Sequence, residues 1–420
     1  MEEVGVNTSG PPLPRLGVVC NIGSAGPLLI GRAATGLCEV VFVIDTTVDW
    51  VRARMDEITD CGLVCDVTGL DVASQAKVLR EWRLDAIVTF SDNELLRTAE
   101  LAQDLGLRFH TPATVRTILD KVVQRRMLRE AGVDDTASLP VGSARELAQA
   151  LGEVHFPAVL KPRQGRAGLN TFRLHGQEDV DELLSGTDLA SGYTVESMLS
   201  GEPSVAGLDW GDYVSVESSV IGGTIRHVAV CGKTPLTYPF RETGQFFPST
   251  LDDRTELAVT ELVTRAVQAL GITHGSTHTE VKLTADGPRV IEVNGRMGGY
   301  FYWMFRDGED GWDIVRAALQ TALGLPPDPA EDTGEVVYLL CPQPPADAVS
   351  LVELPGVDRV RALPGVRRVD IRTHPGKDLG WRNGTSTLLA LVYGTVPDHA
   401  ALLPLIRAVH SELAPSYRYG

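Results

Sequence analysis

Two carboxylates occupy the arms of a predicted β-hairpin in the second half of the chain. Glu280 and Glu292 each lie six residues from Asp286, which begins an Asp-Gly turn, so we expect them nearly opposite each other on paired strands. Side-chain alternation puts Asn294 on the face of Glu292. Two acids and an amide oxygen suit Mg²⁺, with Mn²⁺ as the alternative ion, because hard cations prefer oxygen ligands. A solvated hairpin face whose acids pair with nearby cations explains the same spacing, and both interpretations stay open.

Two lysines lie near short glycine-containing segments. Lys161 ends the predicted strand "FPAVLKP", and Gly165 and Gly168 follow it in "GRAG". A glycine-containing loop with exposed backbone amides beside a lysine can bind phosphate. Lys121 lies in a predicted helix, within "LDKVVQRRM". The spacing is not that of a Walker A motif, and each lysine taken alone is better explained by a structural or solvated role.

A strand and its edge follow this loop in "YTVESMLSGEP". Glu196 closes the strand, and Glu202 comes directly after Gly201. Such an edge can present backbone N–H and C=O groups to a flat purine, with an acid nearby for ribose hydroxyls. An interdomain hinge is the simpler explanation of this segment taken alone.

The elements that must position these side chains change character along the chain. Short apolar runs alternate with helical patterns over residues 15–112, which predicts an open parallel sheet. Helical periodicity over residues 113–150 predicts a connector, and residues 154–200 predict a small α+β unit. Residues 203–300 predict antiparallel hairpins.

A Pro-rich stretch, "GLPPDPAEDTGE", separates a final α+β module. We expect this module either to close the substrate pocket or to form a subunit interface, so a homodimer is one expected assembly. The predicted domains are an N-terminal α/β unit, a connector with a lid, a catalytic core and a C-terminal module, at residues 1–112, 113–202, 203–328 and 329–420.

Composition restricts the classes of partner. The net charge of −17 argues against nucleic acid and against anionic membrane surfaces, and no apolar run approaches a membrane span. The acidic, Pro-rich start, "MEEVGVNTSGPPLPR", predicts a frayed leader rather than a signal peptide. The six cysteines are scattered without a CxxC motif, which predicts reduced thiols in a cytoplasmic protein.

Taken together and in this order, the segments resemble the ATP-grasp superfamily of carboxylate–amine ligases. The resemblance covers roughly residues 15–325 and rests on "LDKVVQRRMLREAGV", "FPAVLKPRQGRAG", "VESMLSGEPS", "HTEVKL" and "VIEVNGRMGG". It implies an ATP-grasp fold: an open parallel α/β sheet, a small lid, an antiparallel ATP-binding core and a C-terminal α+β module.

The resemblance also implies a nucleotide site. ATP would lie between the two α+β units, with Lys121 and Lys161 on its α- and β-phosphates. Mg²⁺ would be held by Glu280, Glu292 and Asn294. The residues implied in nucleotide binding are Lys121, Lys161, Gly165, Arg166, Gly168, Glu196, Ser197, Met198, Leu199 and Glu202.

Catalysis is implied for Arg296 together with Lys161. Arg296 would stabilise an acyl phosphate and the tetrahedral intermediate, where negative charge develops. Gly298 and Gly299 would let a substrate carboxylate approach the backbone. Tyr300 opens the aromatic run "YFYWMF", whose default interpretation is a packed core. We hypothesise that Tyr300 shapes the first-substrate pocket.

Within the superfamily, the sequence is most similar to the L-amino acid ligases, which make dipeptides, and to carnosine-synthase-like enzymes. The supporting segments are "THTEVKL", "EVNGRMGGYF" and "PFRETGQFFPSTL". Glu242 would hold the α-amino group of the first amino acid, and Gln245 replaces an expected histidine, so a base at that position is in doubt. The implied function joins an amino acid to a second amino acid or small amine. Two alternatives are a ligase or carboxylase for a non-amino-acid substrate, and a silent nucleotide-binding protein.

Overall fold

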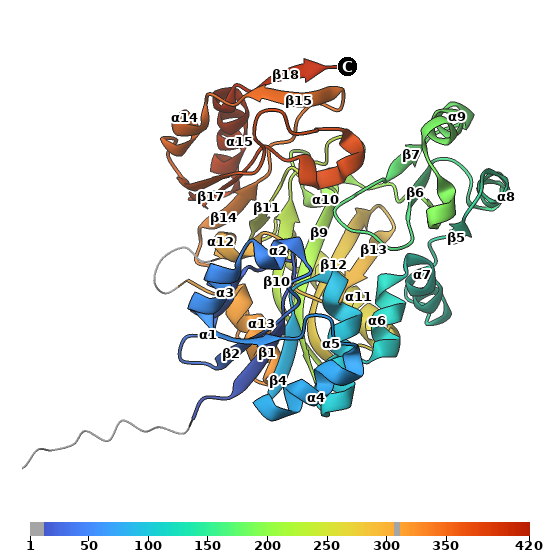
Figure 1. The fold of residues 1–420 in the computed structure, drawn as a ribbon. Coiled ribbons are helices and arrows are strands. Elements are labelled where there is room, and N and C mark those ends of the chain that lie inside the picture. Colours follow the sequence, from blue (N-terminus) through green and yellow to red (C-terminus); the bar gives the residue numbers. More distant parts are fainter. Residues whose placement is uncertain (1–11, 306–310) are drawn as a thin grey trace, which may run out of the picture.

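The structure is a computed structural model, and it describes residues 12–305 and 311–420. Residues 1–11, most of the predicted leader, lie outside this description. Figure 1 shows the N-terminal unit (blue) packed on one long sheet, a lid (green) beside that sheet and the C-terminal part (red) at its end. Among the described helices, none is long and apolar enough to cross a membrane.

The N-terminal unit contains the predicted parallel sheet. Its strand order is β3-β2-β1-β4, and β1 pairs in parallel with both β2 and β4. Both faces are covered, as parallel sheets require: Leu16 and Val18 belong to one apolar cluster and Val19 to another. The elements are β1 Arg15–Val19, α1 Pro27–Ala34, β2 Glu39–Ile44, α2 Asp49–Arg52, α3 Met55–Cys61, β3 Leu63–Asp66, α4 Val72–Trp82, β4 Ala86–Thr89, η1 Asp92–Glu94 and α5 Leu95–Leu105.

The helical connector is shorter than predicted. It consists of α6 (Pro112–Leu119) and α7 (Lys121–Glu130), which are separated at Asp120 because this residue is extended and its carboxylate caps α7. The following segment forms β5 (Ser138–Val141) and α8 (Ala144–Val154), which belong to the lid. Because β5 has only four residues, its side-chain alternation is too short to recognise in the sequence. The helical periodicity of α8 therefore wrongly predicts a continuation of the connector.

The lid is a four-stranded antiparallel sheet with its own core. Its strand order is β5-β8-β6-β7. Apolar side chains of α8, α9 and the sheet pack together, including Leu147, Leu160 and Val195. The remaining lid elements are β6 Ala158–Pro162, β7 Phe172–Leu174, α9 Gln177–Gly186, η2 Leu189–Ser191 and β8 Tyr193–Ser197.

Most strands of the rest of the molecule form one eight-stranded sheet, in the order β13-β12-β9-β10-β11-β14-β17-β16. Its pairs are antiparallel, as the hairpin patterns predict. The C-terminal strands continue the sheet through β11 and β14, so the predicted boundary at residue 328 crosses a continuous sheet, and the domain division stays a prediction. The strands are β9 Tyr213–Ile221, β10 Thr224–Lys233, β11 Gly244–Phe247, β12 His274–Thr284, β13 Gly287–Asn294, β14 Val336–Leu340, β16 Val366–Ile371 and β17 Ala390–Val396.

The two faces of this sheet bury different partners. On β14, Tyr338 and Leu340 pack toward one cluster and Leu339 toward the other, which is the period of a strand. The second cluster includes Leu16 of β1, so the N-terminal unit and the long sheet share a core. The other elements are α10 Pro203–Ala206, α11 Asp253–Ala269, α12 Phe301–Phe305, α13 Ile314–Ala322, β15 Ala348–Glu353, α14 Val357–Arg361, η3 Trp381–Thr387, α15 His399–Leu413 and β18 Ser416–Tyr419.

Candidate active site

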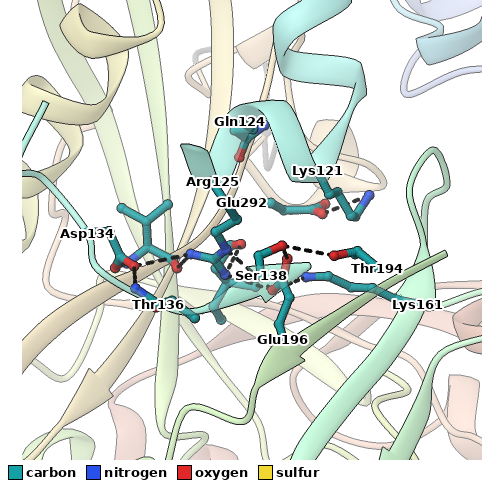
Figure 2. Close-up of polar contacts among 12 residues, drawn as sticks. Lys121, Gln124, Arg125, Asp134, Thr136, Ser138, Lys161, Thr194, Glu196 and Glu292 are labelled. Atoms are coloured by element: carbon teal, nitrogen blue, oxygen red, sulfur yellow. Dashed lines mark hydrogen bonds and ion pairs between the residues drawn. The ribbon is translucent and has the colours of Figure 1, made fainter. Parts of the chain in front are cut away.

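A cavity of about 190 Å³ is lined by lid residues and by the long sheet. Charged side chains gather on one side of it, and Figure 2 shows several of them pointing toward one another. Apolar side chains such as Val159, Met198 and Ile291 complete a surface that can contact a flat ring. The sequence-predicted residues that line this cavity are Lys121, Lys161, Gly165, Arg166, Gly168, Glu196, Ser197, Met198, Leu199, Glu242, Glu280 and Glu292.

The two hairpin carboxylates lie where the register predicts. Glu280 of β12 is directly opposite Glu292 of β13, and Asn294 donates from Nδ2 to Oε1 of Glu292 at 3.1 Å. Nζ of Lys121 lies 3.2 Å from Oε2 of Glu292. Burial raises the pKa of Glu292, but Lys121 and Lys161 outweigh it and lower that pKa to about 2. Glu292 is therefore ionised at neutral pH.

Lys161 is oriented by a buried acid. Its Nζ lies 2.9 Å from Oε2 of Glu196, which is 3% exposed. Arg125 of α7 contacts the same carboxylate at 3.2 Å, and Ser138 donates to its other oxygen at 3.3 Å (Figure 2). Protein donors thus reach both oxygens of the Glu196 carboxylate, and residues 197–199 line the cavity next to it.

The loop between β6 and β7, residues 163–171, is held from several directions, and we name it the phosphate loop. The carbonyl of Gly165 accepts a hydrogen bond from Nζ of Lys121 at 3.0 Å. Arg166 donates to Asn93 of the N-terminal unit at 2.8 Å. Glu202 lies apart from this cavity: its carboxylate caps α10 by accepting from Ser204 N at 3.1 Å.

On the other side of the cavity, Glu242 pairs with a lysine that sequence reasoning missed. Lys233, at the end of β10, is 2% exposed. Its Nζ lies 3.1 Å from Oε1 of Glu242 and donates to Oε1 of Gln245 at 2.8 Å. Gln245, in the position where a histidine was expected, therefore supplies an amide oxygen to a buried cation. One feature of the sequence indicates that Lys233 is functional: it is a charged residue at the end of an otherwise apolar strand segment.

Arg296 also has a counter-ion that the sequence did not indicate. Its guanidinium makes two hydrogen bonds to Asp92 of η1, at 2.9 and 2.7 Å. Bidentate pairs of this kind fix the orientation of the guanidinium plane. Arg296 does not line the 190 Å³ cavity. Neither do Asn294 and Gln245.

The loop after Arg296 is held by a second buried network. The N–H of Gly298 donates to Oε2 of Glu217 at 2.9 Å, and the other oxygen of Glu217 bonds His278. A Cβ on Gly298 would lie 2.2 Å from the ring of Phe301, so glycine is required there for packing. Gly299 faces open space, which leaves room for a ligand beside the backbone.

Tyr300 follows these glycines with φ +63°, which is unusual for a residue with a side chain. Its ring lies 5.6 Å from the guanidinium carbon of Arg372, a residue of the C-terminal part. Tyr300, Gly298 and Gly299 do not line the 190 Å³ cavity. The sequence-predicted site therefore divides into a group around that cavity and a second group beside it.

Glu280 and Glu292 are the candidate ligands of a divalent cation. Within residues 12–305 and 311–420, no three His, Cys, Asp or Glu side chains are arranged to hold a metal ion. The facing Glu280 and Glu292 nevertheless fit Mg²⁺, because this ion is commonly bound by one or two carboxylates plus substrate phosphates and waters.

Comparison with known proteins gives partial matches in sequence and a full match in fold. No protein-family model matches the chain. Carnosine synthase 1 of Homo sapiens is 28% identical over 273 residues, which are 59% of this chain and 32% of that protein. Alanine–anticapsin ligase of Bacillus subtilis is 28% identical over 240 residues, which are 53% of this chain and 51% of that protein. The chain thus spans about a third to a half of these curated relatives.

The structural match is more extensive. The crystal structure of the L-amino acid ligase from Bacillus licheniformis covers 97% of this chain and 100% of its own, with a TM-score of 0.73 and 20% identity. Both the parallel N-terminal sheet and the antiparallel core are included in that overlap. The predicted ATP-grasp fold is therefore confirmed.

Proposed function

We propose that the protein is an ATP-dependent amide ligase. It activates the carboxylate of an amino acid as an acyl phosphate and joins it to the amine of a second amino acid or small amine, releasing ADP and phosphate. One observation carries the proposal: a single cavity combines two lysines, a glycine-containing loop, two facing carboxylates and the Glu242 carboxylate. The names of the relatives, a carnosine synthase, an alanine–anticapsin ligase and an L-amino acid ligase, support it.

In this proposal the lid side of the cavity binds ATP. Lys121 and Lys161 neutralise phosphate charge, and the backbone of residues 197–199 faces the adenine. Glu280 and Glu292 hold Mg²⁺, which when bound neutralises the charge that develops during phosphoryl transfer. Because Glu196 already balances Lys161, its role is to orient that ammonium rather than to contact the base.

The reaction then needs two displacements. A carboxylate oxygen attacks the γ-phosphorus and ADP leaves, which forms the acyl phosphate. The amine attacks the acyl carbon, phosphate leaves, and a proton of the amine passes to the departing phosphate. Arg296 stabilises the negative charge of both steps, and Asp92 fixes its guanidinium. Lid closure over the cavity excludes water that would hydrolyse the intermediate.

The test is phosphate release from ATP and Mg²⁺ across single amino acids and pairs, with products identified by mass. Release that requires a pair, with ADP and a condensed mass, supports the proposal. Release with bicarbonate or another carboxylate in place of an amino acid favours the alternative ligase or carboxylase. ATP binding with no turnover under any condition favours a silent nucleotide-binding protein.

A further inference from the structure

The phosphate loop touches a segment more than 200 residues away in sequence. This segment is η3, Trp381–Thr387, in the C-terminal part. The N–H of Thr385 donates to the carbonyl of Ala167 at 2.9 Å, and the N–H of Asn170 donates to the carbonyl of Arg382 at 2.8 Å. Two backbone hydrogen bonds therefore join η3 to the loop that faces the cavity.

Side chains of η3 reinforce the contact with the lid. Arg382 donates to Oγ1 of Thr187 at 2.8 Å, and its guanidinium carbon lies 5.0 Å from the ring of Phe172. The ring of Trp381 is nearly perpendicular to the same ring, with 5.5 Å between the two centroids. The contact thus combines a polar interaction with the residue after α9 and aromatic interactions with β7, the strand that follows the loop.

Thr385 also reaches the other side of the cavity. Its Oγ1 accepts a hydrogen bond from the N–H of Glu242 at 3.1 Å, and the residue itself lines the cavity. Thr385 is 3% exposed. One residue therefore bonds both the phosphate loop, through its backbone, and the backbone of the acid that pairs with Lys233, through its hydroxyl.

Gly384 makes this approach possible. Its backbone has φ +60° and ψ −147°, a region that residues with a Cβ avoid. A Cβ at this position would lie 2.1 Å from the carbonyl oxygen of Ala167. Any larger residue would push η3 away from the phosphate loop.

We propose that η3 forms part of the wall of the active site, and that Thr385 is a positioning residue that fixes the phosphate loop relative to Glu242. The inference rests on the proposed function and deepens it, because it assigns the C-terminal module a part in the site. Through Thr385, the position of the nucleotide phosphates is coupled to the position of the carboxylate substrate.

The first experiment compares Gly384→Ala with Gly376→Ala. Gly376 also has a positive φ, +85°, but a Cβ there meets nothing within 4 Å, so this control places alanine at a positive φ without the clash. Hydrogen exchange is followed at the amides of Asn170 and Thr385, with and without Mg²⁺ and a non-hydrolysable ATP analogue. We expect Gly384→Ala to raise both exchange rates roughly tenfold or more, to raise the KM for ATP, and to increase ATP consumed per amide formed.

The second experiment isolates the hydroxyl. Thr385→Val keeps the backbone bond to Ala167 but removes the acceptor for the N–H of Glu242. We expect it to raise the KM for the carboxylate substrate several-fold with little change in loop exchange, and Thr385→Ser to restore the wild-type value. A role in folding alone would not produce this separation.

The outcomes separate the two hypotheses. If Gly384→Ala matches Gly376→Ala in amide exchange and in nucleotide affinity, or if Thr385→Val leaves the KM of the carboxylate substrate unchanged, the inference is overturned. If the wild type condenses no pair of substrates, the proposed function fails, while the exchange measurement still decides whether η3 holds the loop.

Discussion

Two walls of the site handle charge differently. The nucleotide wall, made of Lys121, Lys161, Glu280 and Glu292, surrounds an open cavity that both lysines and both acids line. The substrate wall, made of Lys233 with Glu242, Arg296 with Asp92, and His278 with Glu217, consists largely of discrete ion pairs. Both lysines of the first wall also have acidic partners, Glu292 and Glu196. The difference is access: all four charged groups of the first wall line the cavity, whereas of the six in the second wall only Glu242 does.

This difference has an energetic consequence. Charges that face a cavity can be changed with a modest effect on folding, because water or ligand solvates the partner that remains. Removing one partner of a buried pair leaves the other uncompensated, which typically costs 3–5 kcal/mol. Substitutions in the nucleotide wall should therefore act mainly on catalysis, and those in the substrate wall on catalysis and stability together.

The largest effect is expected for Glu292→Gln. Removing this carboxylate takes away half of the facing pair that fits Mg²⁺, and kcat should fall roughly 10²–10³-fold. Because the neighbouring lysines lower the pKa of Glu292 to about 2, its charge also stabilises the fold, and the free energy of unfolding should fall by on the order of 1–3 kcal/mol, as measured by urea denaturation. The exposed Glu335→Gln serves as a control. A large loss of stability with unchanged kcat would reverse the roles assigned to the two walls.

The next effect concerns the pH dependence of stability at His278. Burial lowers the pKa of this residue, but Glu217 and Glu280 outweigh it and raise the pKa from 6.5 to about 9. Protonated His278 therefore stabilises the fold. This contribution is fully present below about pH 6.5 and is lost as pH rises through about 9. We expect the free energy of unfolding to fall by on the order of 1–3 kcal/mol between pH 6.5 and 9.5.

The matched variant for this test is His278→Gln. Glutamine can still donate to a carboxylate but does not titrate, so its stability should be lower at pH 6.5 and nearly flat up to pH 9.5. If the free energy of unfolding changes with pH equally in the wild type and in His278→Gln, His278 is not charged in the folded state.

A smaller effect is expected for Asp92→Asn. The amide keeps one acceptor for Arg296 but loses the charge and the second bond, so kcat should fall roughly 10- to 30-fold. The KM for ATP should change little, because Asp92 does not line the nucleotide cavity. Asp92→Glu should recover part of the loss. A kcat equal to or above that of the wild type would indicate that Arg296 leaves Asp92 when substrate binds.

The two walls also differ in how far the sequence predicted them. The hairpin turn predicts that Glu280 and Glu292 lie nearly opposite each other, and they do, although the pairing depends on a register shift between Glu280 and Val281 that the sequence did not indicate. The parallel and antiparallel sheets follow from local periodicity. Asp92, Lys233 and Glu217 were missed, because the significance of each depends on a partner brought close by the fold. The contact between Asp92 and Arg296 joins residues 204 positions apart, and no local pattern encodes it.

The same argument explains the connector and the C-terminal part. The separation of α6 from α7 depends on the extended conformation of Asp120. A single aspartate in a helical pattern is only a weak indication that one helix ends there and another begins. Continuation of the long sheet into β14 and β17 depends on pairing with β11, which periodicity does not specify. Sequence reasoning therefore found elements and hairpins but could not assign the C-terminal strands to a sheet.

The smallest effect is expected for Tyr300→Ala, which tests whether the substrate wall selects by shape. The ring lies beside Arg372, and its removal should enlarge the space beyond Gly299. We expect kcat/KM for bulky first substrates to rise roughly three- to tenfold relative to small ones, because a pocket discriminates by a few kcal/mol at most per group. Tyr300→Phe keeps the ring and should keep the wild-type preference. Competition between a small and a large amino acid in one reaction, read by product mass, gives the ratio directly. An unchanged substrate range in Tyr300→Ala would mean that the pocket wall lies elsewhere, and that selection depends on the ion pairs of the substrate wall.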